Sequence, residues 1–296
     1  MTPFHRPWVL VGCCMALSGC LTRRAADVLT VPRRVVEAGH WEKETATKPA
    51  RFDVEAADGV VLSALELPAD PAVPKRGTAY LFHGFGNTKE QMLPIAKRLT
   101  AVGFRCVAWD SRGHGKSGGE RASYGMREVD DALRVIKASR KRDHRPRGKD
   151  VFWGYSMGAA VALQTLPEDS RADAAVLLAP FADLSQIMRH HAGQIYSGAM
   201  VPFLPWVRSN VRSAAGFDLR RIKPVESVRR TNARLLFIHG GRDGVIPPDH
   251  SARLLAECEE GQGKRLLLPN LGHGDVMWNL PASAYAAAVD FLSEDH

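Results

Sequence analysis

The feature that most constrains the fold is a series of short, wholly apolar runs, each followed by a stretch with helical periodicity. Such runs cover residues 78–84, 105–110, 151–153, 174–180, 234–240 and 264–268, and helices are predicted over 89–102, 127–142, after 156, 249–260 and 282–292. Strands that are apolar along their whole length are buried on both faces, and alternation with helices is typical of parallel sheets. The pattern therefore predicts an α/β fold with a mostly parallel, twisted sheet and helices on both faces.

Two segments depart from this alternation. Residues 51–69 contain two β-like runs separated by Ala57-Asp58-Gly59, which predicts a hairpin and an antiparallel edge. About fifty residues, from 181 to about 231, separate two late strands and include many apolar side chains. Connections of this length are usually functional or structured on their own account. We expect a helical cap above the strand ends, with an ordinary packed excursion as the alternative.

The amino terminus has the layout of a secretory signal peptide. A basic start precedes an apolar run from Trp8 to Leu17, which is too short to span a bilayer. Residues 17–20, Leu-Ser-Gly-Cys, resemble the bacterial lipobox, and the resemblance implies cleavage before Cys20 and lipid attachment to its thiol. We therefore expect a signal peptide at 1–19, a tether at 20–49 and a folded domain at 50–296. The expected location is the bacterial cell envelope, lipid-anchored at the outer membrane or the periplasmic face of a membrane.

Charge and cysteine content narrow the possible partners. The formal charge of +8 comes from scattered arginine and lysine residues, which indicates a solvated surface, with attraction to an anionic membrane as the alternative. Basic residues are not interleaved with aromatic residues in the way that is typical of nucleic-acid-binding proteins, so we do not expect a nucleic-acid partner. No cluster has metal-ligand spacing, so we expect neither metal nor cofactor. Cys106 and Cys258 are expected to be packed thiols, and the oligomeric state is not predicted.

Polar residues fall where the predicted strands end. His83, Asp110, Ser156, Asp243 and His273 each follow an apolar run. Ligands of open α/β sheets bind outside the carboxyl ends of the strands. Because Ser156 lies in Gly-Tyr-Ser-Met-Gly, directly after a strand and before a helix, we expect a sharp turn that exposes its hydroxyl. The two glycines would remove side chains that collide with neighbouring backbone.

The order serine, acid, histidine, here Ser156, Asp243 and His273, resembles that of the α/β-hydrolase superfamily. The stretches HGFGNTKEQ, WDSRGHGKSGG and GYSMGAAVAL are similar to its monoglyceride-lipase and serine-aminopeptidase-like branch. The resemblance extends from about residue 51 to 292 and implies the α/β-hydrolase fold with a Ser-His-Asp triad. It also implies an oxyanion hole formed by the backbone N–H groups of Phe85 and Met157.

Other residues compete for these roles. His250 and His239 are alternatives to His273 as the base, and Asp183 is the alternative to Asp243 as the acid. His83 is expected to shape its loop rather than to move protons. We expect a further set to support the site from beneath, namely Asp110, Arg112 and His114.

The expected function is a serine hydrolase that cleaves carboxylic esters, such as acyl-glycerols or lysophospholipids, through an acyl-enzyme. The apolar cap and the lipid anchor favour lipid substrates. An aminopeptidase or an acyltransferase with the same triad is the first alternative. A non-catalytic envelope-binding module is the second, because a fold does not dictate function.

Overall fold

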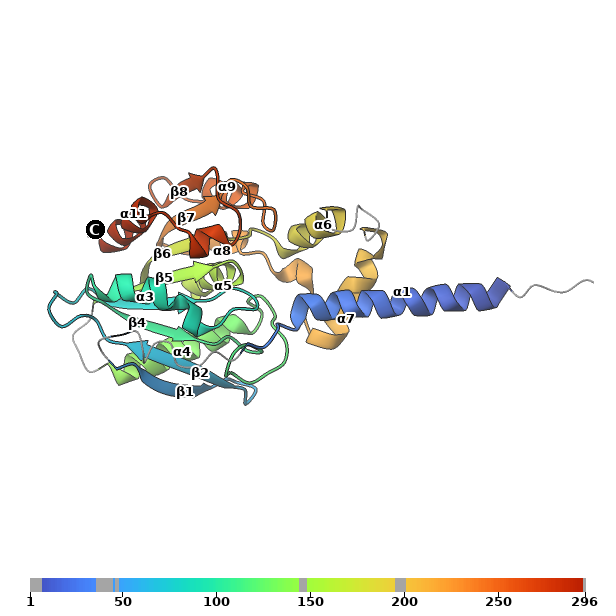
Figure 1. The fold of residues 1–296 in the computed structure, drawn as a ribbon, viewed down its shortest axis with the longest axis horizontal. Helices are drawn as coiled ribbons and strands as arrows, with labels where there is room; N and C mark the ends of the chain where they lie inside the picture. Colours follow the sequence, from blue (N-terminus) through green and yellow to red (C-terminus); the bar gives the residue numbers. More distant parts are fainter. Residues whose placement is uncertain (1–6, 36–44, 46–47, 144–147, 195–200, 295–296) are drawn as a thin grey trace, which may run out of the picture.

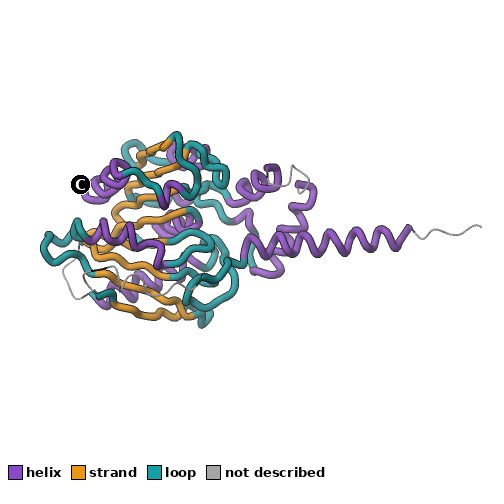
Figure 2. Tube along the Cα trace, in the orientation of Figure 1, coloured by secondary structure: helices purple, strands orange, loops and turns teal. Residues whose placement is uncertain are grey.

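The computed structural model describes residues 7–35, 45, 48–143, 148–194 and 201–294, and for residues 7–18 and 194 it describes the backbone only. Figures 1 and 2 show a sheet with helices on both sides and a group of helices beyond one end of the strands. The strands are β1 (Ala50–Glu55), β2 (Val61–Leu67), β3 (Gly77–Phe82), β4 (Phe104–Trp109), β5 (Lys149–Tyr155), β6 (Ala172–Leu178), β7 (Arg234–Gly240) and β8 (Gly263–Leu268).

The eight strands form one sheet in the order β1-β2-β4-β3-β5-β6-β7-β8. The pairs β1–β2 and β2–β4 are antiparallel, and every later pair is parallel. Strands β4, β5, β6 and β7 are buried along nearly their whole length, as continuous apolar runs require. The predicted mostly parallel sheet with an antiparallel hairpin at its edge is therefore confirmed.

Helices cover both faces of the sheet and enclose two separate apolar clusters. Alternate strand residues point to opposite faces. One face packs against α3 (Leu93–Thr100), α10 (Asp275–Trp278) and α11 (Ala282–Ser293). The other packs against α4 (Glu128–Arg142), α5 (Met157–Thr165), α8 (Val225–Val228) and α9 (Asp249–Ala256). Short 3-10 helices occupy Lys89–Met92, Leu166–Glu168, Val201–Phe203 and Leu219–Arg221.

The segment between β6 and β7 contributes the helices beyond the strand ends. It contains α6 (Leu184–Gln194) and α7 (Leu204–Ala215), which share a third apolar cluster with Phe181 and Ile246. These helices extend past the carboxyl ends of the parallel strands, on the right of Figure 1. We refer to α6 and α7 as the cap.

The amino-terminal helix α1 (Pro7–Thr30) lies alongside α7 in Figure 1. Its last turns are packed: Ala26 is fully buried within the apolar cluster of the cap. Residues 20–30, the first part of the tether expected at 20–49, are helical, and Ala25, Ala26 and Leu29 pack in the apolar cluster of the cap. Of the remaining tether positions, 36–44 and 46–47 lie outside the described residues. Within the described parts of the chain, no helix is long and apolar enough to cross a membrane.

Candidate active site

Ser156 occupies a strained turn between β5 and α5. Its backbone has φ 53° and ψ −117°, in a region that residues other than glycine rarely adopt. A Cβ atom at Gly158 would lie 2.2 Å from the carbonyl oxygen of Phe82, and one at Gly154 would lie 2.6 Å from the Cα atom of Ala159. Both glycines are therefore required for the close approach of α5 to the sheet, as the sequence predicts.

Three side chains from distant parts of the chain form one hydrogen-bonded series. The hydroxyl of Ser156 lies 3.0 Å from Nε2 of His273, in the loop after β8. Nδ1 of the same imidazole lies 2.7 Å from Oδ2 of Asp243, in the loop after β7. The structure thus brings together the predicted serine, histidine and acid.

The environment of Asp243 fixes the direction of these hydrogen bonds. Its side chain is fully buried, and Oδ1 accepts the backbone N–H groups of Val245 (2.9 Å) and Ile246 (2.7 Å). Burial opposes ionisation, but hydrogen bonds from His239 and His273 outweigh it and hold the pKa of Asp243 below its usual value. An ionised carboxylate only accepts, so Nδ1 of His273 carries the proton and Nε2 is free to accept from Ser156.

The competing residues have other partners. His239 is fully buried, with Nε2 placed 2.9 Å from the carbonyl oxygen of Ile246 and 3.3 Å from Oδ2 of Asp243. Nδ1 of His250 accepts the backbone N–H of Ala182, and burial, with the charge of Arg253, lowers its pKa to about 4. Neither imidazole is hydrogen-bonded to the serine.

Asp183, the alternative acid, begins the cap. Its Oδ1 accepts the hydroxyl of Ser185 (2.6 Å) and the backbone N–H of Gln186 (3.2 Å). A carboxylate that accepts from the first turn of a helix is a capping group. In the structure Asp183 therefore ends the connection from β6 and starts α6, while Asp243 contacts the imidazole.

The predicted oxyanion donors belong to residues that line the same pocket as Ser156. Met157 follows Ser156 at the first position of α5, and Phe85 lies in the loop after β3. Among the described residues neither backbone N–H donates to a protein acceptor. His83, the first residue after β3, is buried and bridges two loops: Nδ1 donates to the carbonyl of Gly84 (2.8 Å), and Nε2 accepts the backbone N–H of Ser111 (2.9 Å). Burial, with repulsion from His114, lowers the pKa of His83 to about 3, so it stays neutral.

A buried ion pair lies beneath this loop. The side chains of Lys89 and Asp110 are 1% and 2% exposed and form a direct salt bridge. Oδ1 of Asp110 also accepts the backbone N–H of Lys89, and Oδ2 accepts that of Lys116, both at 2.8 Å. Burial penalises the Asp110 carboxylate, but Lys89 and these hydrogen bonds lower its pKa below the usual value. The pair ties the loop after β3 to the loop after β4.

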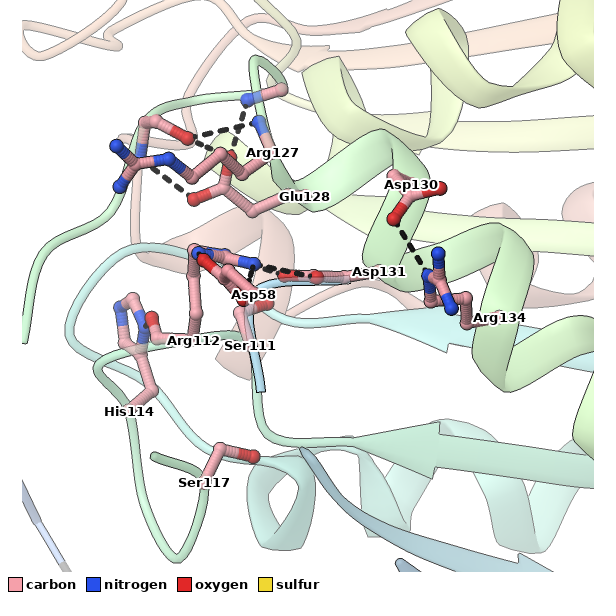
Figure 3. Close-up of polar contacts among 12 residues, drawn as sticks. Asp58, Ser111, Arg112, His114, Ser117, Arg127, Glu128, Asp130, Asp131 and Arg134 are labelled. Carbon is pink, nitrogen blue, oxygen red and sulfur yellow. Dashed lines mark hydrogen bonds and ion pairs between the residues drawn. The ribbon is translucent and has the colours of Figure 1, made fainter. Parts of the chain in front are cut away.

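Arg112 forms a second network on the same loop. Figure 3 shows its guanidinium beside Asp131 of α4 and Asp58 of the β1–β2 hairpin. The bonds to Asp131 measure 2.6 and 2.7 Å, and the bond to Asp58 measures 2.8 Å. His114 packs edge-on against Phe85, with ring centroids 5.6 Å apart. These contacts agree with the supporting position expected for Asp110, Arg112 and His114.

An apolar pocket of about 380 Å³ opens at Ser156. This volume is at the lower end of the range of roughly 300–1,000 Å³ common for small-molecule sites. The lining comes from the loops around the serine, from the cap and from α1: Ala25, Val28, Leu29, Phe85, Tyr124, Ser156, Met157, Phe181, Leu184, Ile187, Met188, His191, Ala192, Leu204, Val207, Val245 and Ile246. The described lining contains no acidic residue. Within the described ranges, no group of three or more His, Cys, Asp or Glu side chains is arranged to hold a metal ion.

Sequence reasoning missed two contributors to this pocket. Tyr124 has a left-handed backbone, with φ 57°, and its ring stacks on that of Phe85 at a centroid distance of 5.7 Å. Residues 25–29 of α1 form part of the wall. The apolar spacing of Ala25, Val28 and Leu29, which places them on one helical face, is the signal that identifies the second contributor.

The fold and this site define an enzyme of the α/β-hydrolase class. A family model described as "Serine aminopeptidase, S33" matches residues 73–224, which is half of the chain. The chain therefore belongs to the serine aminopeptidase, S33 family of hydrolases.

The chain is also similar to individual proteins and to a solved structure. The uncharacterized protein YqkD of Bacillus subtilis is 27% identical over 60% of this chain, and the match spans 58% of that relative, a little more than half its length. The uncharacterized protein YfhR of Escherichia coli K12 is 25% identical over 90% of this chain and 89% of its own. Among solved structures, the Pyrococcus furiosus esterase Pf2001 is similar in fold, with a TM-score of 0.73 and 21% identity. That likeness covers 89% of this chain and 97% of the esterase.

Proposed function

We propose that this hydrolase cleaves carboxylic esters with apolar acyl groups through an acyl-enzyme on Ser156. The observation that carries the proposal is the hydrogen-bonded series Ser156–His273–Asp243 at the base of an apolar pocket. A serine hydroxyl is a weak nucleophile until an adjacent base accepts its proton. The imidazole at 3.0 Å is within reach of that proton, and the buried carboxylate stabilises the imidazolium that forms.

The reaction follows from this geometry. Oγ of Ser156 bonds to the ester carbonyl carbon while its proton moves to Nε2 of His273, and the carbonyl oxygen becomes an oxyanion. The N–H groups of Phe85 and Met157, which donate to no protein acceptor in the described part of the chain, would donate to this oxyanion. The carbon–oxygen bond to the alcohol then breaks, and Nε2 returns the proton to the leaving alkoxide. A water molecule, deprotonated by the same nitrogen, releases the acid and restores the serine.

The pocket favours an ester over the substrate of an aminopeptidase. A free α-amino group is charged near neutral pH, and a charge removed from water requires an opposite charge or several hydrogen bonds. The described lining offers aliphatic and aromatic side chains and, as polar groups, Ser156, Tyr124 and His191. It offers no carboxylate to an ammonium group.

Steady-state hydrolysis of p-nitrophenyl acetate, butyrate and octanoate, beside aminoacyl p-nitroanilides, tests the proposal. We expect ester hydrolysis that rises with acyl length, because each buried methylene contributes about 0.8 kcal/mol. Ser156→Ala and His273→Ala should each remove the activity, whereas His250→Gln, at a histidine that contacts the backbone of Ala182, should retain it. Faster cleavage of the anilides than of the esters would identify an aminopeptidase instead.

We also infer that the protein is anchored to the cell envelope by lipid on Cys20. This inference rests on the resemblance of residues 17–20 to a lipobox, and Cys20 is exposed, as a modified thiol requires. Cleavage before Cys20 would leave residues 20–30 of α1 in place on the cap. In a bacterial host, Cys20→Ser should move the protein from the membrane fraction to the soluble fraction, while Cys258→Ser, at a partly buried thiol, should not. Unchanged membrane association of the first variant would contradict the inference.

A further inference from the structure

The last two turns of α1 form part of the pocket that contains Ser156. Ala25, Val28 and Leu29 all line it, and their spacing of three and four residues places them on one face of the helix. Val28 lines the pocket although it is 72% exposed to solvent. This part of α1 therefore separates the pocket from solvent rather than lying within the protein. We call residues 22–30 the wall helix.

The wall helix is fixed to the cap along one side. Ala26 is fully buried in the apolar cluster that includes Val207 and Val211 of α7. The hydroxyl of Thr22 accepts a hydrogen bond of 2.9 Å from the side-chain amide of Asn210, also on α7. The buried Ala26 and the hydrogen bond between Thr22 and Asn210 therefore hold the wall helix against α7.

The carboxyl end of the wall helix is fixed to the body of the protein by four hydrogen bonds. Arg121 donates to Asp27 and to the hydroxyl of Thr30, both at 2.7 Å. The backbone N–H of Ala122 donates to the carbonyl of Thr30 at 2.7 Å. The hydroxyl of Tyr124 donates to the carbonyl of Leu29 at 2.6 Å. The last bond also satisfies one of the carbonyl groups that a helix end leaves without a partner.

Tyr124 is itself held in a strained conformation by its neighbours. The carboxylate of Glu128 accepts the backbone N–H groups of Ser123 (2.7 Å) and Gly125 (2.8 Å), on either side of the tyrosine. Figure 3 labels Glu128 and marks its hydrogen bonds with dashed lines. The amide of Gln164 donates to the carbonyl of Tyr124 at 2.9 Å. Strained residues persist where surrounding structure determines them, and they concentrate at functional sites. Here the strain lets one ring contact both the wall helix and Phe85.

We propose that the wall helix sets the acyl-chain specificity of the enzyme, as the outer wall of the acyl pocket. The inference rests on the proposed ester hydrolysis at Ser156. The substrates it fits are esters whose acyl chain is long enough to pass beyond the serine and lie against Ala25, Val28 and Leu29. Short acyl groups end before this wall and do not contact it.

The size of the effect follows from burial of methylene groups. About 0.8 kcal/mol for each buried methylene corresponds to roughly a fourfold gain in kcat/KM. A phenylalanine side chain at position 25 would point into the pocket and displace about two methylenes of a bound octanoyl chain. The kcat/KM ratio of octanoate to acetate should therefore fall by about 16-fold.

The test uses the full chain with p-nitrophenyl octanoate and p-nitrophenyl acetate. Ala25→Phe should lower the ratio by an order of magnitude. Val28→Asp, at a solvent-exposed position that tolerates a polar side chain, should lower it at least threefold. The matched control is Ala286→Phe, which introduces the same ring on an exposed position of α11 and should leave the ratio unchanged. Circular dichroism of each variant verifies folding.

Two results would overturn the inference in distinguishable ways. If the wild-type enzyme hydrolyses both esters through Ser156 and both wall-helix variants keep its ratio within twofold, the wall helix does not determine specificity. If the wild-type enzyme hydrolyses neither ester, the proposed function fails and the inference fails with it. The first result leaves the proposed function intact.

Discussion

Replacing Asp243 with asparagine should abolish most of the activity while leaving the fold intact. Oδ1 of Asp243 accepts two backbone N–H groups, from Val245 and Ile246, so the asparagine oxygen must take that position. Its NH₂ group then faces Nδ1 of His273 and donates to it. The imidazole proton moves to Nε2, which can no longer accept the proton of Ser156.

The size of the loss in kcat follows from the free-energy cost of the alternative orientation of the asparagine amide. If the amide flips, its oxygen faces the imidazole, but two backbone N–H groups then point at an NH₂ group. Each unsatisfied buried donor costs about 1–3 kcal/mol, so the productive orientation lies about 2–6 kcal/mol higher. This range corresponds to a loss in kcat of roughly 30- to 10⁴-fold, and the same exchange in a serine-protease triad lowers kcat by about 10⁴.

The assay is kcat for p-nitrophenyl butyrate, with urea unfolding to verify the fold. Asp183→Asn is the matched control, because its oxygen can still accept the hydroxyl of Ser185 and the N–H of Gln186. It should retain kcat within about twofold. A loss of less than tenfold in Asp243→Asn, or an equal loss in Asp183→Asn, would refute the assignment of the acid.

Three further predictions concern the scaffold. Lys89→Met should lower the free energy of unfolding by about 3–5 kcal/mol in urea titrations, because it leaves the buried Asp110 carboxylate without its cation; a loss below 1 kcal/mol would contradict this. Gly158→Ala places a Cβ atom 2.2 Å from a backbone oxygen of β3, so kcat/KM should fall about 100-fold by displacement of the serine turn, and wild-type kinetics would be inconsistent with that turn. The folded-state pKa values of His83 and His250, about 3 and about 4, lie below the value of about 6.5 expected when unfolded. The unfolded chain therefore binds more protons in acid, so the contribution of these two histidines to stability is present above pH 6.5 and each should remove about 2 kcal/mol between pH 7 and pH 5. In urea titrations at the two pH values, His250→Gln should reduce the total loss by about 2 kcal/mol, and an unchanged loss would contradict this.

The sheet and the three polar residues at its edge could be predicted from sequence because the relevant signals are local. Strands β4 to β7 are continuous apolar runs, and Ser156, Asp243 and His273 each lie in the loop or turn that follows a strand. The residues Gly154 to Gly158, placed directly after an apolar strand, indicate the turn, because Ser156 requires a glycine on either side. The parallel topology then brings the three residues together, because the carboxyl ends of parallel strands lie at one edge of the sheet.

The wall of the pocket could not be predicted from local sequence signals of this kind. The bond between Tyr124 and Leu29 joins residues 95 positions apart, and no periodicity encodes it. Residues 21–49 taken together are polar and basic, which favours a tether. In the structure Ala25, Ala26 and Leu29 pack against the cap, and this tertiary packing stabilises the helix beyond its local propensity. The left-handed backbone of Tyr124 is likewise imposed by Glu128 and Gln164 rather than by its own preference.

Covalent labelling with a fluorophosphonate, followed by intact-protein and peptide mass spectrometry, tests most directly whether Ser156 is the nucleophile. We expect one adduct per chain, located on Ser156, at a rate that falls sharply in His273→Ala because the imidazole at 3.0 Å no longer accepts the hydroxyl proton. Absence of labelling at Ser156 in the folded wild-type protein, or equal labelling in His273→Ala, would contradict it.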